Sequence, residues 1–210
     1  MYSLGEIEAQ CKKAAKGVGL SWGLAEETGL IARHLSELRL PGPDAIYLSL
    51  KFIDDNGLEH PSIYEGSFDE IGKPKTGLLL GVFFLDCLSD VLESNIKIKD
   101  PVIGPLSVVG ALLRLQNEQY SFSVSWDNCQ ITMNEDGFNV SGKNINPKSV
   151  GSLVVSISGS SKEPFFLKQS IERSSIDSWD FLTKMAHKTY VPESPMSRLL
   201  GAGADDNENE

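Results

Sequence analysis

Apolar residues recur at helical spacing near the start of the chain. Over residues 4–18 they fall at intervals of three and four, which predicts a helix with one buried side. Ser3 and Glu6 form the S-x-x-E pattern, in which each side chain accepts a hydrogen bond from the other residue's free backbone N–H. Ser21 is a good N-cap for a second helix, which the Pro41-Gly42-Pro43 stretch stops. The pattern therefore predicts an N-terminal helical hairpin.

The polarity pattern then changes to a period of two. Over residues 46–53, Ile46, Leu48, Leu50 and Phe52 alternate with Tyr47, Ser49, Lys51 and Ile53. Such alternation predicts a strand, and Asp54-Asp55-Asn56-Gly57 predicts a turn after it. Residues 58–76 contain four Pro or Gly residues and are interpreted as irregular.

Two strongly apolar runs occupy the middle of the chain, at residues 78–92 and 106–115. Their lengths favour buried helices, and Pro105 stands at the first turn of the second one. Apolar runs of this kind leave a strand open as the alternative.

Residues 120–158 have the pattern of an antiparallel meander. Tyr120, Phe122, Val124 and Trp126 alternate with Ser121, Ser123, Ser125 and Asp127, as in a strand with one wet face. Asp127-Asn128 and Asp136-Gly137 are predicted to close hairpins, and residues 153–157 to form another strand. Residues 165–168 are a candidate for one more strand.

A last helix is predicted to begin near Ser174 or Ser175 and to end at Pro192. Asp177 is favourably placed in its first turn. Its expected buried stripe consists of Ile176, Trp179, Leu182, Ala186 and Tyr190.

Together these elements predict an α+β fold, with an N-terminal helical hairpin, a central antiparallel sheet with buried helices, and a C-terminal helix. The 210-residue chain is long enough to bury one full core. We therefore expect a single domain over residues 1–204, followed by an acidic flexible tail at residues 205–210.

Charge narrows the range of partners. The chain has 19 Lys and Arg against 29 Asp and Glu, a formal net charge of −10. Because nucleic acids and anionic membranes attract basic surfaces, we expect neither as a partner. Three isolated cysteines and the lack of a secretory signal or a long apolar span favour a soluble protein of the reducing cytoplasm.

The first candidate site is the segment from Gly19 to Glu27. Ser21 and Trp22 open the second predicted helix, where free backbone N–H groups can bind an anion. Glu26 and Glu27 suit a cation or an amine instead. The alternative is an ordinary capped helix whose Trp22 packs into the core.

The second candidate site is the segment from Tyr190 to Gly203. Arg198 can hold a carboxylate or phosphate in bidentate fashion, and the backbone of Gly201 and Gly203 can approach the same anion. Ser194 and Ser197 supply hydroxyl groups, and Tyr190 is a further candidate ligand-binding residue. The alternative is a loose tail with one solvated arginine.

Two residues are candidates for proton transfer: His187 on the last predicted helix and Glu27 near the other end of the chain. An ordinary surface histidine is the alternative interpretation of His187. Neither His34 nor His60 has ligand-like spacing, so we expect no metal site, and no cofactor-binding motif is present in the sequence.

The two end segments resemble a known family. Residues 14–27, Ala-Ala-Lys-Gly-Val-Gly-Leu-Ser-Trp-Gly-Leu-Ala-Glu-Glu, are similar to the N-terminal signature of an uncharacterised family with a domain of unknown function. Residues 186–194 and 197–204 are similar to its C-terminal signature, although the family pattern often has a further Gly where this chain has Asp205. The resemblance implies a cytoplasmic, proteobacterial protein whose C-terminal motif is ordered and docked near the N-terminal helices. It brings no assigned reaction.

Three functions remain open at this point. The leading hypothesis is a cytoplasmic protein that binds a small polar or anionic metabolite, with catabolic catalysis of a small acid as an extension. The second is a non-catalytic accessory or assembly protein, with Trp22 and Tyr190 as interface anchors in a homo-oligomer or a complex with another protein. A sensor that binds a metabolite without turnover is the third.

Overall fold

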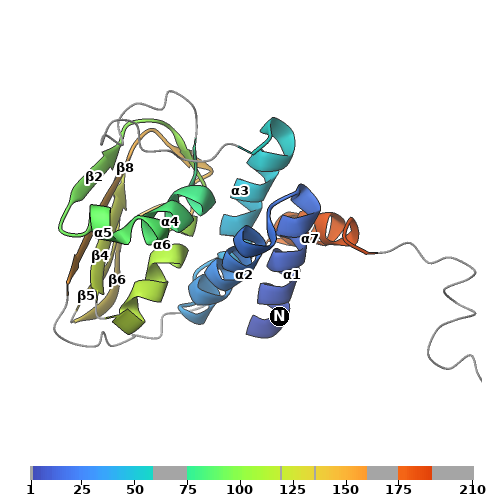
Figure 1. Cartoon of the computed structure of the whole chain (residues 1–210), viewed down its shortest axis with the longest axis horizontal. Coiled ribbons are helices and arrows are strands. Elements are labelled where there is room, and N and C mark those ends of the chain that lie inside the picture. The colour runs from blue at the N-terminus through green and yellow to red at the C-terminus, as the bar shows by residue number, and fades with distance from the viewer. Residues whose placement is uncertain (1, 59–74, 119, 135, 160–174, 191–210) are drawn as a thin grey trace, which may run out of the picture.

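The computed structural model describes residues 2–58, 75–118, 120–134, 136–159 and 175–190. The fold is α+β, as predicted, with the sheet on one side and α1, α2, α3 and α7 on the other (Figure 1). The helices are α1 (Leu4–Val18), α2 (Trp22–Glu37), α3 (Gly42–Asn56), α4 (Gly77–Asp86), α5 (Leu88–Val91), α6 (Leu106–Leu112) and α7 (Ile176–His187), with a 3-10 helix at Leu113–Glu118.

The predicted N-terminal helical hairpin is confirmed. The Ser3 hydroxyl accepts a hydrogen bond from the Glu6 backbone N–H, and the Glu6 carboxylate accepts one from the Ser3 N–H at 2.7 Å. Gly19, with φ of 104°, ends α1 in a conformation that suits glycine. Ser21 caps α2 by accepting from the Leu24 N–H. These local hydrogen bonds explain why the two helix starts are legible in the sequence.

The strand predicted at residues 46–53 is wrong, because these residues belong to α3. The buried residues fall at helical intervals, at Ala45, Ile46, Ser49, Leu50 and Ile53. Pro43 lies in the first turn, where a proline is compatible with a helix. The alternating pattern was a coincidence, since Leu48 and Phe52 are only half-buried.

A five-stranded antiparallel sheet confirms the predicted meander in part: the strands at 120–126, 129–134 and 137–142 pair in turn, whereas the strand at 153–159 returns to pair with the first of them. Its order is β2-β8-β4-β5-β6. The strands are β2 (Asn95–Ile98), β4 (Tyr120–Trp126), β5 (Cys129–Asn134), β6 (Gly137–Gly142) and β8 (Leu153–Gly159). One face carries the buried apolar residues, and the other carries a row of uncharged polar residues across all five strands (Asn95, Ser156, Ser123, Thr132 and Asn139).

The apolar middle of the chain forms helices, as expected. The run at residues 78–92 divides at Cys87 into α4 and the short α5. Every residue of α6 is buried, because this helix packs against α4, α2 and α3 and also contacts β4. The second apolar run thus joins the helical part of the molecule to the sheet.

A small second sheet lies beside these helices. It pairs β1 (Lys75–Thr76) in parallel with β3 (Val102–Ile103), which also pairs with β7 (Ser149–Val150) in antiparallel fashion. The sequence predicts irregular structure over residues 58–76. For residues 75 and 76 this prediction is wrong, because they form β1. The irregular segment at 59–74 and the candidate strand at 165–168 lie outside the described residues.

The last helix begins as predicted but differs in two details. Ser175 is the N-cap of α7, and Asp177 lies in the first turn. However, the helix ends at His187, before Pro192. Ile176 is 80% exposed, so it does not belong to the buried stripe, which Leu182, Met185 and Ala186 form.

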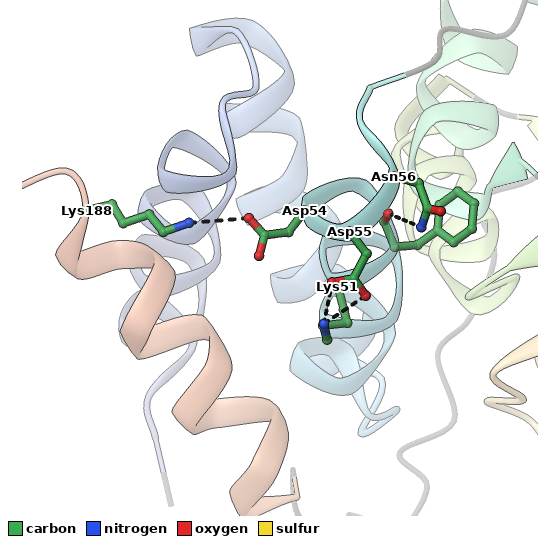
Figure 2. A network of polar contacts seen from close by, with 6 residues as sticks. Lys51, Asp54, Asp55, Asn56 and Lys188 are labelled. Atoms are coloured by element: carbon green, nitrogen blue, oxygen red, sulfur yellow. Dashed lines mark hydrogen bonds and ion pairs between the residues drawn. The ribbon is translucent and has the colours of Figure 1, made fainter.

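The helices α3 and α7 run parallel and in register. The carboxylate of Asp44 accepts hydrogen bonds from the N–H of Ser175 at 2.9 Å and from the hydroxyl of Ser178 at 2.6 Å. Ten residues further along both helices, the ammonium of Lys188 donates to Asp54 at 3.3 Å (Figure 2). This pairing fixes both ends of α7 on α3.

The C-terminal end of α3 carries two aspartates, and nearby lysines neutralise their charge. Figure 2 shows Lys51 donating to both carboxylate oxygens of Asp55, at 2.6 and 2.8 Å, while the Asn56 amide donates to the backbone oxygen of Phe52. Two carboxylates at a helix C-terminus are unfavourable for the helix dipole, so a second lysine, Lys188 from α7, is a stabilising neighbour.

Within the described residues, no helix is both long and apolar enough to cross a membrane. The three cysteines are free thiols. Burial, and then the charge of Asp44, raises the pKa of the Cys11 thiol far above its ordinary value. Cys11 is consequently protonated and acts as a core residue.

Candidate functional site

The structure describes half of the candidate residues. Ser21, Trp22, Glu27, His187 and Tyr190 are placed, and the others lie outside the described residues: Ser194, Ser197, Arg198, Gly201 and Gly203. Four of the placed residues lie in two regions: Ser21 and Trp22 at the α1–α2 connection, and His187 and Tyr190 at the C-terminal end of α7.

A close helix crossing brings these two regions together. A Cβ atom placed on Gly17 of α1 would lie 1.9 Å from the backbone oxygen of Met185 in α7. Only glycine allows this approach of the two backbones. Gly17 lies in the N-terminal segment 14–27 and Met185 immediately precedes the C-terminal segment 186–194, so this crossing brings the described parts of the two end segments close together.

Two lysines of α1 lie over two aromatic rings. The Lys13 ammonium is 5.3 Å from the centre of the Tyr190 ring, and the Lys16 ammonium is 4.7 Å from the centre of the Trp22 ring. The imidazole of His187 lies 5.2 Å from the same tyrosine ring. We call Lys13, Lys16, Trp22, His187 and Tyr190 the aromatic–lysine face.

This face is open to solvent. The Trp22 side chain is 67% exposed and Tyr190 is 51% exposed. The interpretation of Trp22 as a core residue is therefore wrong, and Tyr190 does not belong to the buried stripe of α7. Because each ring contacts a lysine, the aromatic surface and the positive charge lie side by side.

The lysines of the face lack ion pairs with carboxylates among the described residues. Lys16 donates to the backbone oxygen of Leu20 at 2.7 Å, and Lys13 lies 3.5 Å from the Tyr190 hydroxyl. In contrast, Lys12 and Lys188 next to the face are paired with Glu26 and Asp54. The face is thus a local excess of positive charge on an acidic protein.

Ser21 and the start of α2 border this face. The Ser21 hydroxyl accepts the Leu24 N–H as a helix cap, which leaves its own proton available. A Cβ placed on the next glycine, Gly23, would have no atom within 4 Å, so the space above the first turn is open.

Glu27 lies elsewhere and has another role. Its carboxylate accepts a hydrogen bond from the Arg114 guanidinium of the 3-10 helix, and only about a quarter of its side chain is exposed. Its neighbour Glu26 is paired with Lys12 at 2.8 Å. Both carboxylates connect elements of the fold. Glu27 pairs with Arg114, whereas His187, the other candidate for proton transfer, lies beside Tyr190.

A shallow, open depression runs along α7 beside the face. Its lining residues recur at one side of the helix: Asp180, Thr183, Lys184 and His187. Gln10 of α1 donates a hydrogen bond to the Thr183 hydroxyl at 3.0 Å. The depression combines a carboxylate, a hydroxyl, an ammonium and an imidazole. Among the described residues, no group of three or more His, Cys, Asp and Glu side chains is arranged to hold a metal ion.

Sequence reasoning missed Lys13 and Lys16. Their spacing of three residues places them on one side of α1, which is a readable signal. The sequence does not reveal the aromatic partners, because Tyr190 is 177 residues from Lys13.

Comparison with known proteins provides a family description for the first third of the chain. Residues 2–73 match the profile of a family described as "Protein of unknown function (DUF3726)". The match includes Lys13, Lys16 and Trp22 but stops short of His187 and Tyr190. No curated protein and no solved structure matches the chain.

Proposed function

We propose that this protein is a non-catalytic accessory or assembly protein that binds an acidic segment of a partner protein through the aromatic–lysine face. The observation that carries the proposal is the exposure of Trp22 and Tyr190, each beneath a lysine. Large aromatic side chains are enriched among the residues that dominate binding energies at protein interfaces.

The openness of the face favours a protein partner over a small ligand. Small-molecule sites are concave and enclose most of their ligand, whereas protein interfaces use broad surfaces with aromatic anchors. Trp22 and Tyr190 belong to different helical segments, α2 and the end of α7, and are held together through α1. A partner segment that covers both rings would bury apolar area and shield the lysines.

The charge of the face specifies the partner's chemistry. Lys13 and Lys16 lack carboxylate partners among the described residues, so a carboxylate brought by a partner would complete two ion pairs. The rings below them favour apolar side chains next to those carboxylates. A segment that alternates Glu or Asp with Leu or Phe fits this surface.

Replacing Trp22 and Tyr190 together with alanine is expected to weaken partner binding at least tenfold while the fold persists, because both side chains are mainly exposed. The measurement is the mass of the tagged protein purified from extracts of the cells that make it, by size-exclusion chromatography with light scattering. The control is Ile176→Ala, since Ile176 is an even more exposed apolar residue at the other end of α7.

The proposal predicts that a second, different protein co-elutes with the native protein and with Ile176→Ala, and that this second protein is absent from the double variant. Retention of the same complex by the double variant would contradict it. A folded far-ultraviolet circular dichroism spectrum of the double variant excludes loss of structure as the cause.

The depression along α7 supports a second candidate, the binding of a small polar or anionic metabolite. Lys184 and His187 would hold the acid group there, and His187 would also be the proton-transfer group of a catabolic enzyme. The test is a thermal-shift screen against small mono- and dicarboxylates. A carboxylate that binds in the depression is expected to raise the melting temperature of the protein by several degrees. That shift should disappear in Lys184→Ala and persist in Lys188→Ala; a shift that survives in both would exclude this depression.

We further propose the cytoplasm as the compartment, on the basis of three free cysteines of which Cys11 and Cys129 are buried. The two end segments are proposed to be the signatures of one proteobacterial family, of which the matched profile covers only the first.

A further inference from the structure

The strand β6 ends the five-stranded sheet. All six of its residues pair with β5, from Asn134↔Gly137 to Cys129↔Gly142, without a bulge. Among the described residues, no strand pairs with the other side of β6. An edge strand directs the N–H and C=O groups of alternate residues outward, where they can bind another strand.

The edge formed by β6 lacks the usual protection. Its sequence, Gly137-Phe138-Asn139-Val140-Ser141-Gly142, contains neither a charged residue nor a proline. The opposite edge, β2, has only four residues and carries an exposed lysine, Lys97. A lysine on an edge strand disfavours pairing with a strand of another chain. The β2 edge is therefore protected against such pairing, whereas the β6 edge is not.

The distribution of charge identifies the occupant as a copy of the same chain. Residues 92–159, which include the whole large sheet, contain five Lys and Arg against six Asp and Glu, so they carry −1 of the net charge of −10. The remaining residues carry −9. The sheet is therefore the part of this acidic chain where net charge opposes the approach of a second copy least, and β6 itself is uncharged.

We propose that β6 pairs in antiparallel fashion with β6 of a second copy, about a two-fold axis at Val140. The two five-stranded sheets then form one sheet of ten strands. On this axis Val140 faces Val140 of the second copy, and Asn139 lies opposite Ser141 of the second copy. Val140 is half-buried and packs against the core, so the pairing extends the apolar face of each sheet across the interface.

The proposed interface leaves the aromatic–lysine face free. That face lies on α1, α2 and the end of α7, on the other side of the molecule from β6 (Figure 1). A dimer would therefore present two such faces. The inference does not rest on the proposed function, because it depends only on the sheet.

The test measures the mass of the full-length chain by size-exclusion chromatography with light scattering. The native chain is expected to have twice its mass of 22.9 kDa. Val140→Lys would place two like charges against each other on the axis and is expected to give the monomer mass. Ser123→Lys, on the polar face of the central strand β4, is expected to remain dimeric.

A second measurement keeps the proposal testable if Val140→Lys is poorly folded. In a Cys87→Ser background, Val140→Cys is expected to give a covalent dimer with a short bismaleimide, since Cys11 and Cys129 are buried. A native chain of monomer mass at every concentration would overturn the proposal. So would a Val140→Lys variant that remains dimeric, or a dimer that Val140→Cys does not cross-link.

Discussion

A Gly17→Ala variant is expected to lose about 3 kcal/mol of its free energy of unfolding, because the added methyl group would occupy the space of the Met185 backbone oxygen. The obstructing atom belongs to the backbone, so no side chain can rotate away and α7 must shift from α1. The measurement is urea denaturation followed by circular dichroism.

The matched control is Gly5→Ala in the same helix. A Cβ at Gly5 would have nothing within 4 Å, and alanine favours a helix over glycine by about 0.5–1 kcal/mol. The control is therefore expected to be neutral or slightly stabilising. Equal stability of the two variants would show that α1 and α7 do not cross at Gly17.

An Asp44→Ala variant is expected to lose about 2 kcal/mol, because hydrogen bonds to a charged acceptor contribute about 1.5–3 kcal/mol. The substitution removes the acceptor for the Ser175 N–H and the Ser178 hydroxyl at the start of α7. It also removes a carboxylate from the first turn of α3, where a negative charge is favourable. Thermal and urea denaturation both measure the loss.

Asp54→Ala is the control at the other end of the same helix pair. Its partner Lys188 has a side chain that is 47% exposed, and exposed ion pairs contribute at most about 1 kcal/mol. If both variants lost the same stability, the hydrogen bonds at the start of α7 would not be its principal attachment to α3. If neither did, the parallel pairing of α3 and α7 would be wrong.

The sequence predicted those elements whose signals are local. Ser3, Ser21 and Ser175 each bond to a backbone N–H three residues later, so the helix starts are encoded within one turn. The alternating serines of β4 reflect a sheet with one wet face, which a single strand reveals by itself. Both kinds of signal can be recognised in the sequence without the tertiary structure.

Errors arose where a short pattern fits two periods. Ile46 and Leu50 are buried in α3, but they are separated by four residues, a spacing that suits a helix and a two-residue alternation equally. The spacing of Ile176 predicts a place on the buried side of α7, yet this residue lies in the first turn and is exposed. Only the packing of neighbouring helices decides such positions.

Some of the candidate residues that the sequence singles out lie close together in the structure. Trp22, His187 and Tyr190 lie on one face, whereas Glu27 is engaged with Arg114 and stands apart from them. Lys13 and Lys16 could not be identified as site residues, since their contacts with the rings depend on how α7 crosses α1 at Gly17. A long-range crossing of this kind leaves no trace in local spacing.

The central claim is that the aromatic–lysine face binds an acidic partner segment. The most direct test is a nitrogen-15 nuclear magnetic resonance titration of the three tryptophan indole N–H groups with a peptide that alternates Glu and Leu. The Trp22 signal is expected to shift progressively, and to do so less at high salt. The Trp126 indole, which is buried and faces the backbone oxygen of Asn144, should remain unchanged. A Trp22 signal that does not move at saturating peptide, or one that moves equally in a Lys13→Glu, Lys16→Glu variant, would contradict the account.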